Sequence, residues 1–153
     1  MIMVVLLVPV CCCSRKAAKH AKGRREMEEN EIGKCIVDTA VHIHRETGPG
    51  LLETVYEIIL AHQLRQQGLE VIRQVAIPIE YRGLRFEEGF RADLIIEGKV
   101  IVELKCIERL NNAHKKQLLT YLRLTGMHLG YLLNFSGSMM KTGIHRMVNR
   151  LIA

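Results

Sequence analysis

Apolar side chains at the start of the folded part of the chain follow a helical spacing. Between residues 30 and 48 they recur at steps of three and four residues, which places them on one face of a helix. Asn30 is the predicted N-cap of this helix and Gly48 its predicted end. The letters "GPG" then break the chain, and residues 51–68 predict a second amphipathic helix that ends at Gly68.

The spacing then changes to that of strands. Two β-rich runs, residues 70–81 and 84–98, meet at "YRG", and a third strand, residues 99–106, follows a tight turn around Gly98. Residues 111–126 predict a third helix, residues 128–136 a fourth strand, and the end of the chain from Lys141 a short closing helix. The order α-α-β-β-β-α-β-α predicts an α/β fold of the mixed α+β kind, with helices packed on a central mixed sheet of about four strands.

Three ionisable residues interrupt the apolar hairpin "FRADLIIEGKVIVELK", residues 90–105. They are Asp93, Glu103 and Lys105, and a charge in the apolar part of a sheet costs several kcal/mol unless it is paired or bound to a metal. The short turn makes the strands antiparallel, so that Asp93 comes roughly opposite Glu103. Alternation along the strand places Glu103 and Lys105 on one face and Leu104 on the other.

Two acids opposite each other repel, and a divalent cation between them removes the repulsion. Mg²⁺ accepts a few carboxylates and keeps water molecules for the rest of its octahedron. Lys105 is then placed to orient or deprotonate such a water. The alternative from spacing alone is an ion pair between Lys105 and these acids in a surface sheet.

The net charge of +6 is concentrated at the N-terminus. Residues 1–26 hold six basic residues and one acidic residue, which leaves 16 basic and 15 acidic residues in the remainder. The body of the protein is therefore nearly neutral, and a basic groove in it must come from local clustering. We expect one domain at residues 27–153, because 153 residues suffice for one core but not for two.

Residues 1–26 consist of an apolar run followed by a basic run. The apolar run is too short to span a bilayer, and its basic residues follow it instead of preceding it as in a secretory signal. We interpret the segment as a disordered basic extension, or as sequence upstream of a protein that begins at Met27. A membrane-surface anchor acylated at Cys11, Cys12 and Cys13 is the less favoured alternative.

The remaining cysteines, Cys35 and Cys106, are isolated in apolar surroundings and lack the spacing of a zinc site. They are interpreted as buried thiols of a reducing compartment, which predicts a cytoplasmic location.

Two motifs connect the chain to a known family. Asp93 and the run Glu103-Leu104-Lys105 resemble the D…ExK signature of the PD-(D/E)XK nuclease superfamily, with Ala92 where the name has proline. The letters "GLLETVY", residues 50–56, resemble the motif that names the GxxExxY proteins, a branch of that superfamily. The resemblance covers about residues 28–150 and implies a restriction-endonuclease-like core.

The resemblance also implies roles for individual residues. It makes Glu53, Asp93 and Glu103 the metal-binding acids, with the carbonyl oxygen of Leu104 as a further ligand, and Lys105 the catalytic lysine. The expected substrate-binding residues are Gln117, Tyr121, Tyr56, Lys115 and Lys116. The last two lysines depart from the family pattern, in which an acidic residue is more common, and they favour a phosphate backbone.

The function that the resemblance implies is hydrolysis of phosphodiester bonds in DNA or RNA with Mg²⁺ or Mn²⁺. The alternative is a catalytically silent nuclease fold that binds nucleic acid or a protein. Nucleic acid is the expected partner, and a homodimer is compatible with the sequence. Glu53 begins the second helix, where an acid also stabilises the helix N-terminus, so a structural role is the alternative for this residue.

Overall fold

The computed structural model describes residues 25–150. The elements in chain order are α1 (Glu29–Thr47), α2 (Glu53–Gln66), β1 (Val71–Tyr81), β2 (Leu84–Ile96), β3 (Val100–Lys105), α3 (Asn112–Thr125), β4 (Leu129–Asn134), α4 (Met140–Gly143) and β5 (Ile144–Val148). The predictions for residues 1–24, including disorder and the acylated anchor, lie outside the described residues. Arg25 and Glu26 are described, and they form ion pairs of 3.0 Å and 2.6 Å with Glu31 and Lys99 respectively.

The helices form where the apolar spacing predicted them. α1 begins two residues earlier than expected, because its N-cap is Glu28 and not Asn30. The Glu31 carboxylate accepts the Glu28 backbone N–H at 3.1 Å. Gly48 ends the helix as predicted, with a positive φ of 66° that favours glycine. The Asn111 carboxamide caps α3 by accepting the backbone N–H groups of Ala113 and His114.

Within residues 25–150, five strands form one mixed sheet in the order β1-β2-β3-β4-β5. The β3–β4 pair is parallel and is connected through α3, whereas the other neighbours are antiparallel. The mixed α/β class is therefore confirmed, with a fifth strand added.

The prediction of a closing helix from Lys141 is wrong for the described part of this segment. Only the single turn α4 is helical, and β5 then pairs antiparallel with β4. Ile144, Met147 and Val148 are apolar, and over so short a segment their spacing fits a helix as well as a strand. The segment forms a strand because the edge of β4 presents backbone N–H and C=O groups that need hydrogen-bond partners.

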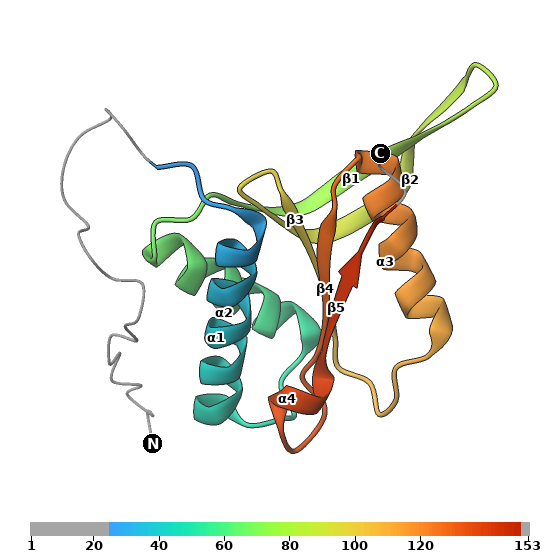
Figure 1. Cartoon of the computed structure of the whole chain (residues 1–153). Helices are drawn as coiled ribbons and strands as arrows, with labels where there is room; N and C mark the ends of the chain where they lie inside the picture. The colour runs from blue at the N-terminus through green and yellow to red at the C-terminus, as the bar shows by residue number, and fades with distance from the viewer. Residues whose placement is uncertain (1–24, 151–153) are drawn as a thin grey trace.

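Helices cover both faces of the sheet (Figure 1). One core lies between the sheet and the pair α1 and α2, and it includes Ile36, Leu60 and Leu104. The second, smaller core lies between the other face and α3, and it includes Ile101, Leu118 and Leu132. The alternation predicted for β3 follows from this arrangement, because Leu104 faces the first core while Ile101, Glu103 and Lys105 face the α3 side.

The β1–β2 hairpin changes face at Gln74 and Asp93. Near the turn to β3, Val71, Leu94 and Ile96 join the first core. Beyond Gln74 and Asp93, the residues at the same alternating positions of the two strands pack into the second core instead. These residues are Val75, Ile77, Phe90 and Ala92. Gln74 has a φ of 52°, and the Gln74–Asp93 pair is missing from the ladder between Arg73–Leu94 and Val75–Ala92. Past this point the hairpin extends as an arm beyond α3 (Figure 1).

Among the residues that the structure describes, no helix is long and apolar enough to cross a membrane. Cys35 is buried and Cys106 is half-buried, and neither forms a disulfide bond within residues 25–150.

Gly143 tests the packing that holds α4 against the end of β4. A Cβ at this position would lie 2.1 Å from the carbonyl oxygen of Asn134, a backbone atom that cannot rotate away. We expect Gly143→Ala to destabilise the protein by about 1–3 kcal/mol, the usual cost of overpacking. Gly137→Ala is the control, because its Cβ would meet its nearest atoms at 3.7 Å. Thermal melts measure both, and equal melting temperatures would contradict the close approach.

Candidate active site

Asp93 and Glu103 bind each other's strands through backbone groups. The β2–β3 strand pairing ends at the Leu94–Val102 pair, and the two acids lie one residue further along. There the Asp93 N–H donates to Oε1 of Glu103 at 3.2 Å, and the Leu104 N–H donates to Oδ2 of Asp93 at 2.9 Å. The two carboxylates thus replace the backbone ladder where the hairpin changes face. The sequence prediction that they lie opposite each other is confirmed.

The Lys105 ammonium lies among three oxygen atoms. Its Nζ donates to the carbonyl oxygen of Leu104 at 2.9 Å, and it lies 3.7 Å from Oε2 of Glu103 and 3.9 Å from Oε1 of Glu53. The lysine side chain is 18 % exposed, so these charges are only partly screened by water. Oxygen atoms of Glu53, Glu103 and Leu104, the residues that the resemblance assigns to a metal ion, therefore surround the Lys105 ammonium.

Glu53 reaches this centre from a different element. It is the first residue of α2, and its Oε2 accepts the Cys106 N–H at 3.1 Å just beyond the end of β3. This bond ties the start of the helix to the strand that carries Glu103 and Lys105. The structure therefore brings Glu53 to the predicted site, where Lys105 offsets part of its charge.

A second acid of α2, Glu57, was not predicted. It is buried, and its carboxylate accepts hydrogen bonds from Arg73 Nε and Gln74 Nε2, each at 2.8 Å. The same Gln74 amide nitrogen lies 3.4 Å from Oδ1 of Asp93. Glu57 thus holds the residue that stands across from Asp93. Its signal in the sequence was the four-residue step from Glu53, which places both acids on one helix face.

Glu103 is the most buried acid of the site, with 3 % of its surface exposed. Burial, followed by the negative charge of Asp93, raises the pKa of Glu103 from 4.5 to about 8, and the Lys105 charge opposes this shift. Without a further cation, the protein therefore favours a protonated Glu103 near neutral pH.

Gln117 and Tyr121 of α3 lie side by side, as their four-residue spacing predicted. The Gln117 amide nitrogen donates to the Tyr121 hydroxyl at 2.7 Å. Burial, with the nearby charges of Glu103 and Asp93, raises the pKa of Tyr121 to about 12. The phenol thus stays neutral and lies within electrostatic reach of the two acids.

Tyr56 does not line the site. Its side chain is fully buried, its ring stacks on Phe135 with centroids 4.3 Å apart, and its hydroxyl donates to the Gly48 carbonyl oxygen. The same hydroxyl accepts the Leu51 N–H at 3.3 Å. Tyr56 therefore holds the loop between α1 and α2, and its burial places it away from the surface that a substrate would contact.

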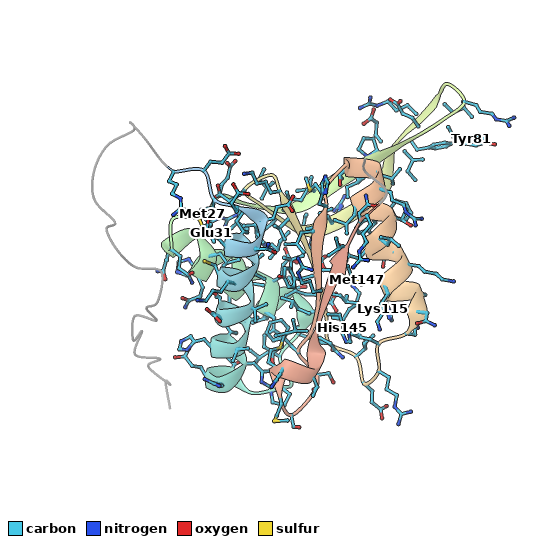
Figure 2. The ribbon with its side chains drawn as sticks, viewed as in Figure 1. Met27, Glu31, Tyr81, Lys115, His145 and Met147 are labelled. Carbon is cyan, nitrogen blue, oxygen red and sulfur yellow. The ribbon has the colours of Figure 1, made fainter. Side chains whose placement is uncertain are left out.

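Lys115 lines a cavity of about 320 Å³ at the end of the parallel strands, whereas Lys116 is exposed. Arg109, Asn134 and His145 line the same cavity, and Figure 2 shows Lys115 of α3 near His145 of β5. Burial, and then the Lys115 charge, lowers the pKa of His145. Sequence reasoning missed Arg109 and His145, because neither stands in a motif and the fold alone brings them to Lys115.

The donor set of the site suits a hard cation in its chemistry. It consists of carboxylate oxygens and one backbone carbonyl, and Oδ1 of Asp93 and Oε2 of Glu103 are the oxygens not used in the bonds between the strands. No three His, Cys, Asp or Glu side chains within residues 25–150 are gathered closely enough to form a metal cage by themselves. Such a cation would thus depend on two or fewer tightly grouped side chains together with the carbonyl of Leu104 and water.

A family comparison matches most of the chain. The PD-(D/E)XK nuclease superfamily matches residues 30–147. The chain belongs to that superfamily. The matched region contains the three acids, Lys105 and the Gln117–Tyr121 pair, and its mixed sheet and helices are consistent with the nuclease fold. No curated protein and no solved structure gives a match.

The raised pKa of Glu103 predicts how the stability of the metal-free protein depends on pH. Between about pH 4.5 and 8 the folded state holds a proton that the unfolded chain has released, so stability falls as pH rises through this window. We expect a melting temperature lower by ~5 °C or more at pH 8.5 than at pH 5.5 in EDTA.

Glu103→Gln is the matched variant, because its amide resembles the protonated acid. Its melting temperature should change much less between the two pH values. A wild-type protein whose stability is the same at both, or a variant with the same dependence, would show that another group causes the effect.

Proposed function

We propose that the protein is a metal-dependent nuclease that hydrolyses phosphodiester bonds of DNA or RNA. The observation that carries the proposal is the position of the Lys105 ammonium among oxygens of Glu53, Glu103 and Leu104. A cationic donor and paired acids at the end of a strand are the parts that phosphodiester hydrolysis requires. Membership of the nuclease superfamily supports the same conclusion.

We also assign the chain to the GxxExxY branch. Each named position of "GLLETVY" has a distinct task in the structure. Gly50 adopts a φ of 112°, Glu53 binds the Cys106 N–H beside Lys105, and Tyr56 closes the loop by bonding to Gly48. These three residues thus fix the start of α2 and the position of Glu53 at the end of β3.

Mg²⁺ or Mn²⁺ would be held by Asp93, Glu103 and the carbonyl oxygen of Leu104, with Glu53 reaching the ion directly or through a water molecule. When bound, such a cation supplies positive charge to the phosphate and lowers the pKa of a coordinated water. Glu103 must lose its proton to act as a ligand, so metal binding and proton release are coupled at this residue.

The chain's own residues position the reactants. Lys105 carries three N–H donors, which can hold the attacking water or a phosphate oxygen. Asp93 is fixed by the Leu104 N–H and Glu103 by the Asp93 N–H, so neither acid has to be ordered when substrate binds. Water forms the new P–O bond, the ester P–O bond breaks, and the proton lost by the water ends on the departing oxygen.

The substrate backbone would run along α3. Lys115 and Arg109 line one cavity together with Glu108 and His145, and these two cations are available to a phosphate in a body that is nearly neutral. Lys116 is exposed beside it, and Gln117 and Tyr121 follow on the same helix. A cytoplasmic location fits Cys35 and Cys106, which form no disulfide bond within the described residues. Nothing in this arrangement requires a homodimer.

A catalytically silent binding protein is the second candidate. The observation that favours it is also at Lys105, whose ammonium offsets the charges of Glu53 and Glu103 without a metal ion. A nuclease fold with such a self-compensated site would still bind nucleic acid through the Lys115 cavity.

Substitution of Lys105 tests catalysis. Lys105→Ala and Glu103→Gln should each lower cleavage of DNA or RNA with Mg²⁺ by on the order of a hundredfold or more, since a positioned donor or a charged ligand is lost. Lys34→Ala is the control, because Lys34 is exposed on α1 and its loss removes only one charge. A panel of structured DNA and RNA provides the substrates, and circular dichroism checks the fold.

Cleavage by the wild type that persists unchanged in both variants would exclude the proposed site. Absence of cleavage of every substrate by the wild type would favour the binding protein.

Metal titration separates the two candidates more directly. We expect calorimetry with Mn²⁺ to show one site in the wild type and weaker binding in Glu53→Gln. In EDTA that variant should be slightly less stable, because Glu53 lies near Lys105 and binds the Cys106 N–H. A folded wild type that binds no Mn²⁺ would support the silent protein, and unchanged affinity in Glu53→Gln would remove Glu53 from the ligand set.

A further inference from the structure

A cavity at the base of the hairpin arm adjoins the candidate active site. It has a volume of about 420 Å³ and lies between the arm and α3, lined by Ala76, Gly89, Phe90, Arg91, Gln117 and Tyr121. Arg91 precedes Asp93 by two residues on β2, a distance of about 6–7 Å along a strand. A ligand in this cavity would thus lie one nucleotide away from the two acids or nearer.

Two aromatic side chains line this cavity. Phe90 of the arm is half-buried, and its ring lies 5.1 Å from that of Tyr121, tilted by 59°. Tyr121 is 2 % exposed, so the Phe90 ring is the one that offers a planar ligand an apolar surface on which to stack. Cavities of roughly 300–1,000 Å³ are the usual size for a small organic ligand, and a single nucleobase fits within the lower part of that range.

The polar groups of the cavity suit a nucleotide. Gln117 donates one N–H to the Tyr121 hydroxyl, and its side chain also carries a second N–H and a carbonyl oxygen, which match the edges of a base. Arg91 is exposed at the rim, where its guanidinium can bind a phosphate. The cavity thus combines an apolar surface, a hydrogen-bonding amide and a cation.

Gly89 allows the two strands of the arm to lie close together beside the cavity. A Cβ at Gly89 would lie 2.4 Å from Cγ1 of Ile79 on the opposite strand. The absence of a side chain lets the two strands of the arm approach closely at the level of the cavity. Phe90, the next residue, then faces α3 across the cavity.

We propose that this cavity binds one unpaired base of a nucleic acid strand whose backbone reaches Asp93 and Glu103. The proposal rests on the proposed function in taking nucleic acid as the substrate. A base within a duplex has both faces covered by its neighbours and cannot stack on Phe90, so the substrate is a single strand, a frayed end or a flap.

Binding without catalysis tests the cavity. Fluorescence anisotropy in EDTA, repeated with Ca²⁺, compares a labelled single-stranded 15-mer with a blunt duplex of the same sequence. We expect the wild type to prefer the single strand, and Phe90→Ala to weaken single-strand binding about tenfold while duplex binding stays the same. Phe90→Tyr keeps an aromatic ring and should restore the affinity.

Two further variants distinguish binding in the cavity from binding elsewhere on the arm. Phe86→Ala removes an aromatic ring 52 % exposed on the same strand, outside the cavity, and should leave the affinity unchanged. Arg91→Gln alters an exposed side chain and should weaken binding of the single strand in a salt-dependent way. An abasic residue moved along the 15-mer should weaken binding to the wild type but not to Phe90→Ala.

Equal affinity for single strand and duplex, or no binding of either, would overturn the proposal. Equal losses in Phe86→Ala and Phe90→Ala would also overturn it, because the arm and not the cavity would then bind. A single-strand preference that depends on Phe90 in a protein that cleaves nothing with Mg²⁺ would support the cavity while excluding the nuclease.

Discussion

The exchange of hydrogen bonds between Asp93 and the Glu103–Leu104 pair is the constraint on which the site depends. A sheet normally satisfies its backbone groups by strand pairing, and here two carboxylates take over where that pairing stops. The substitution frees the hairpin to change face without leaving buried N–H groups unsatisfied. It also forces two acids into the edge of a core, where their charge must be offset by Lys105 or neutralised by a proton.

Three elements approach this pair from different sides, and each brings one kind of group. α2 brings Glu53 to the end of β3, the irregular Gln74 connects Asp93 to buried Glu57, and α3 brings Tyr121 within reach of both acids. The bond from the Cys106 N–H to Glu53 and the bond from Gln74 to buried Glu57 are made within the protein, so this part of the geometry is set by the fold before any ligand arrives. Preorganisation of this kind is how a site lowers the cost of assembling a transition state.

Much of this could be predicted from the sequence, because the decisive signals were local. Helical spacing predicted α1, α2 and α3, and the tight turn at Gly98 was enough to place Asp93 opposite Glu103. The missed features depend on neighbours that the sequence does not reveal. β5 was decided by the open edge of β4, Tyr56 was drawn into the core by Phe135, and Arg109 and His145 met Lys115 only through the parallel crossover.

The face change at Gln74 also separates two regions with different tolerance to change. On one side of it the hairpin shares the main core with α1 and α2, so insertions there would move Asp93 relative to Glu103. On the other side, from Ile79 to Phe86, the arm leaves the body, and Tyr81, Leu84 and Phe86 at its end are more than half exposed. Figure 2 shows Tyr81 far out on this arm. The outer arm could therefore be lengthened or shortened by pairs of residues without moving Asp93 relative to Glu103 at its base.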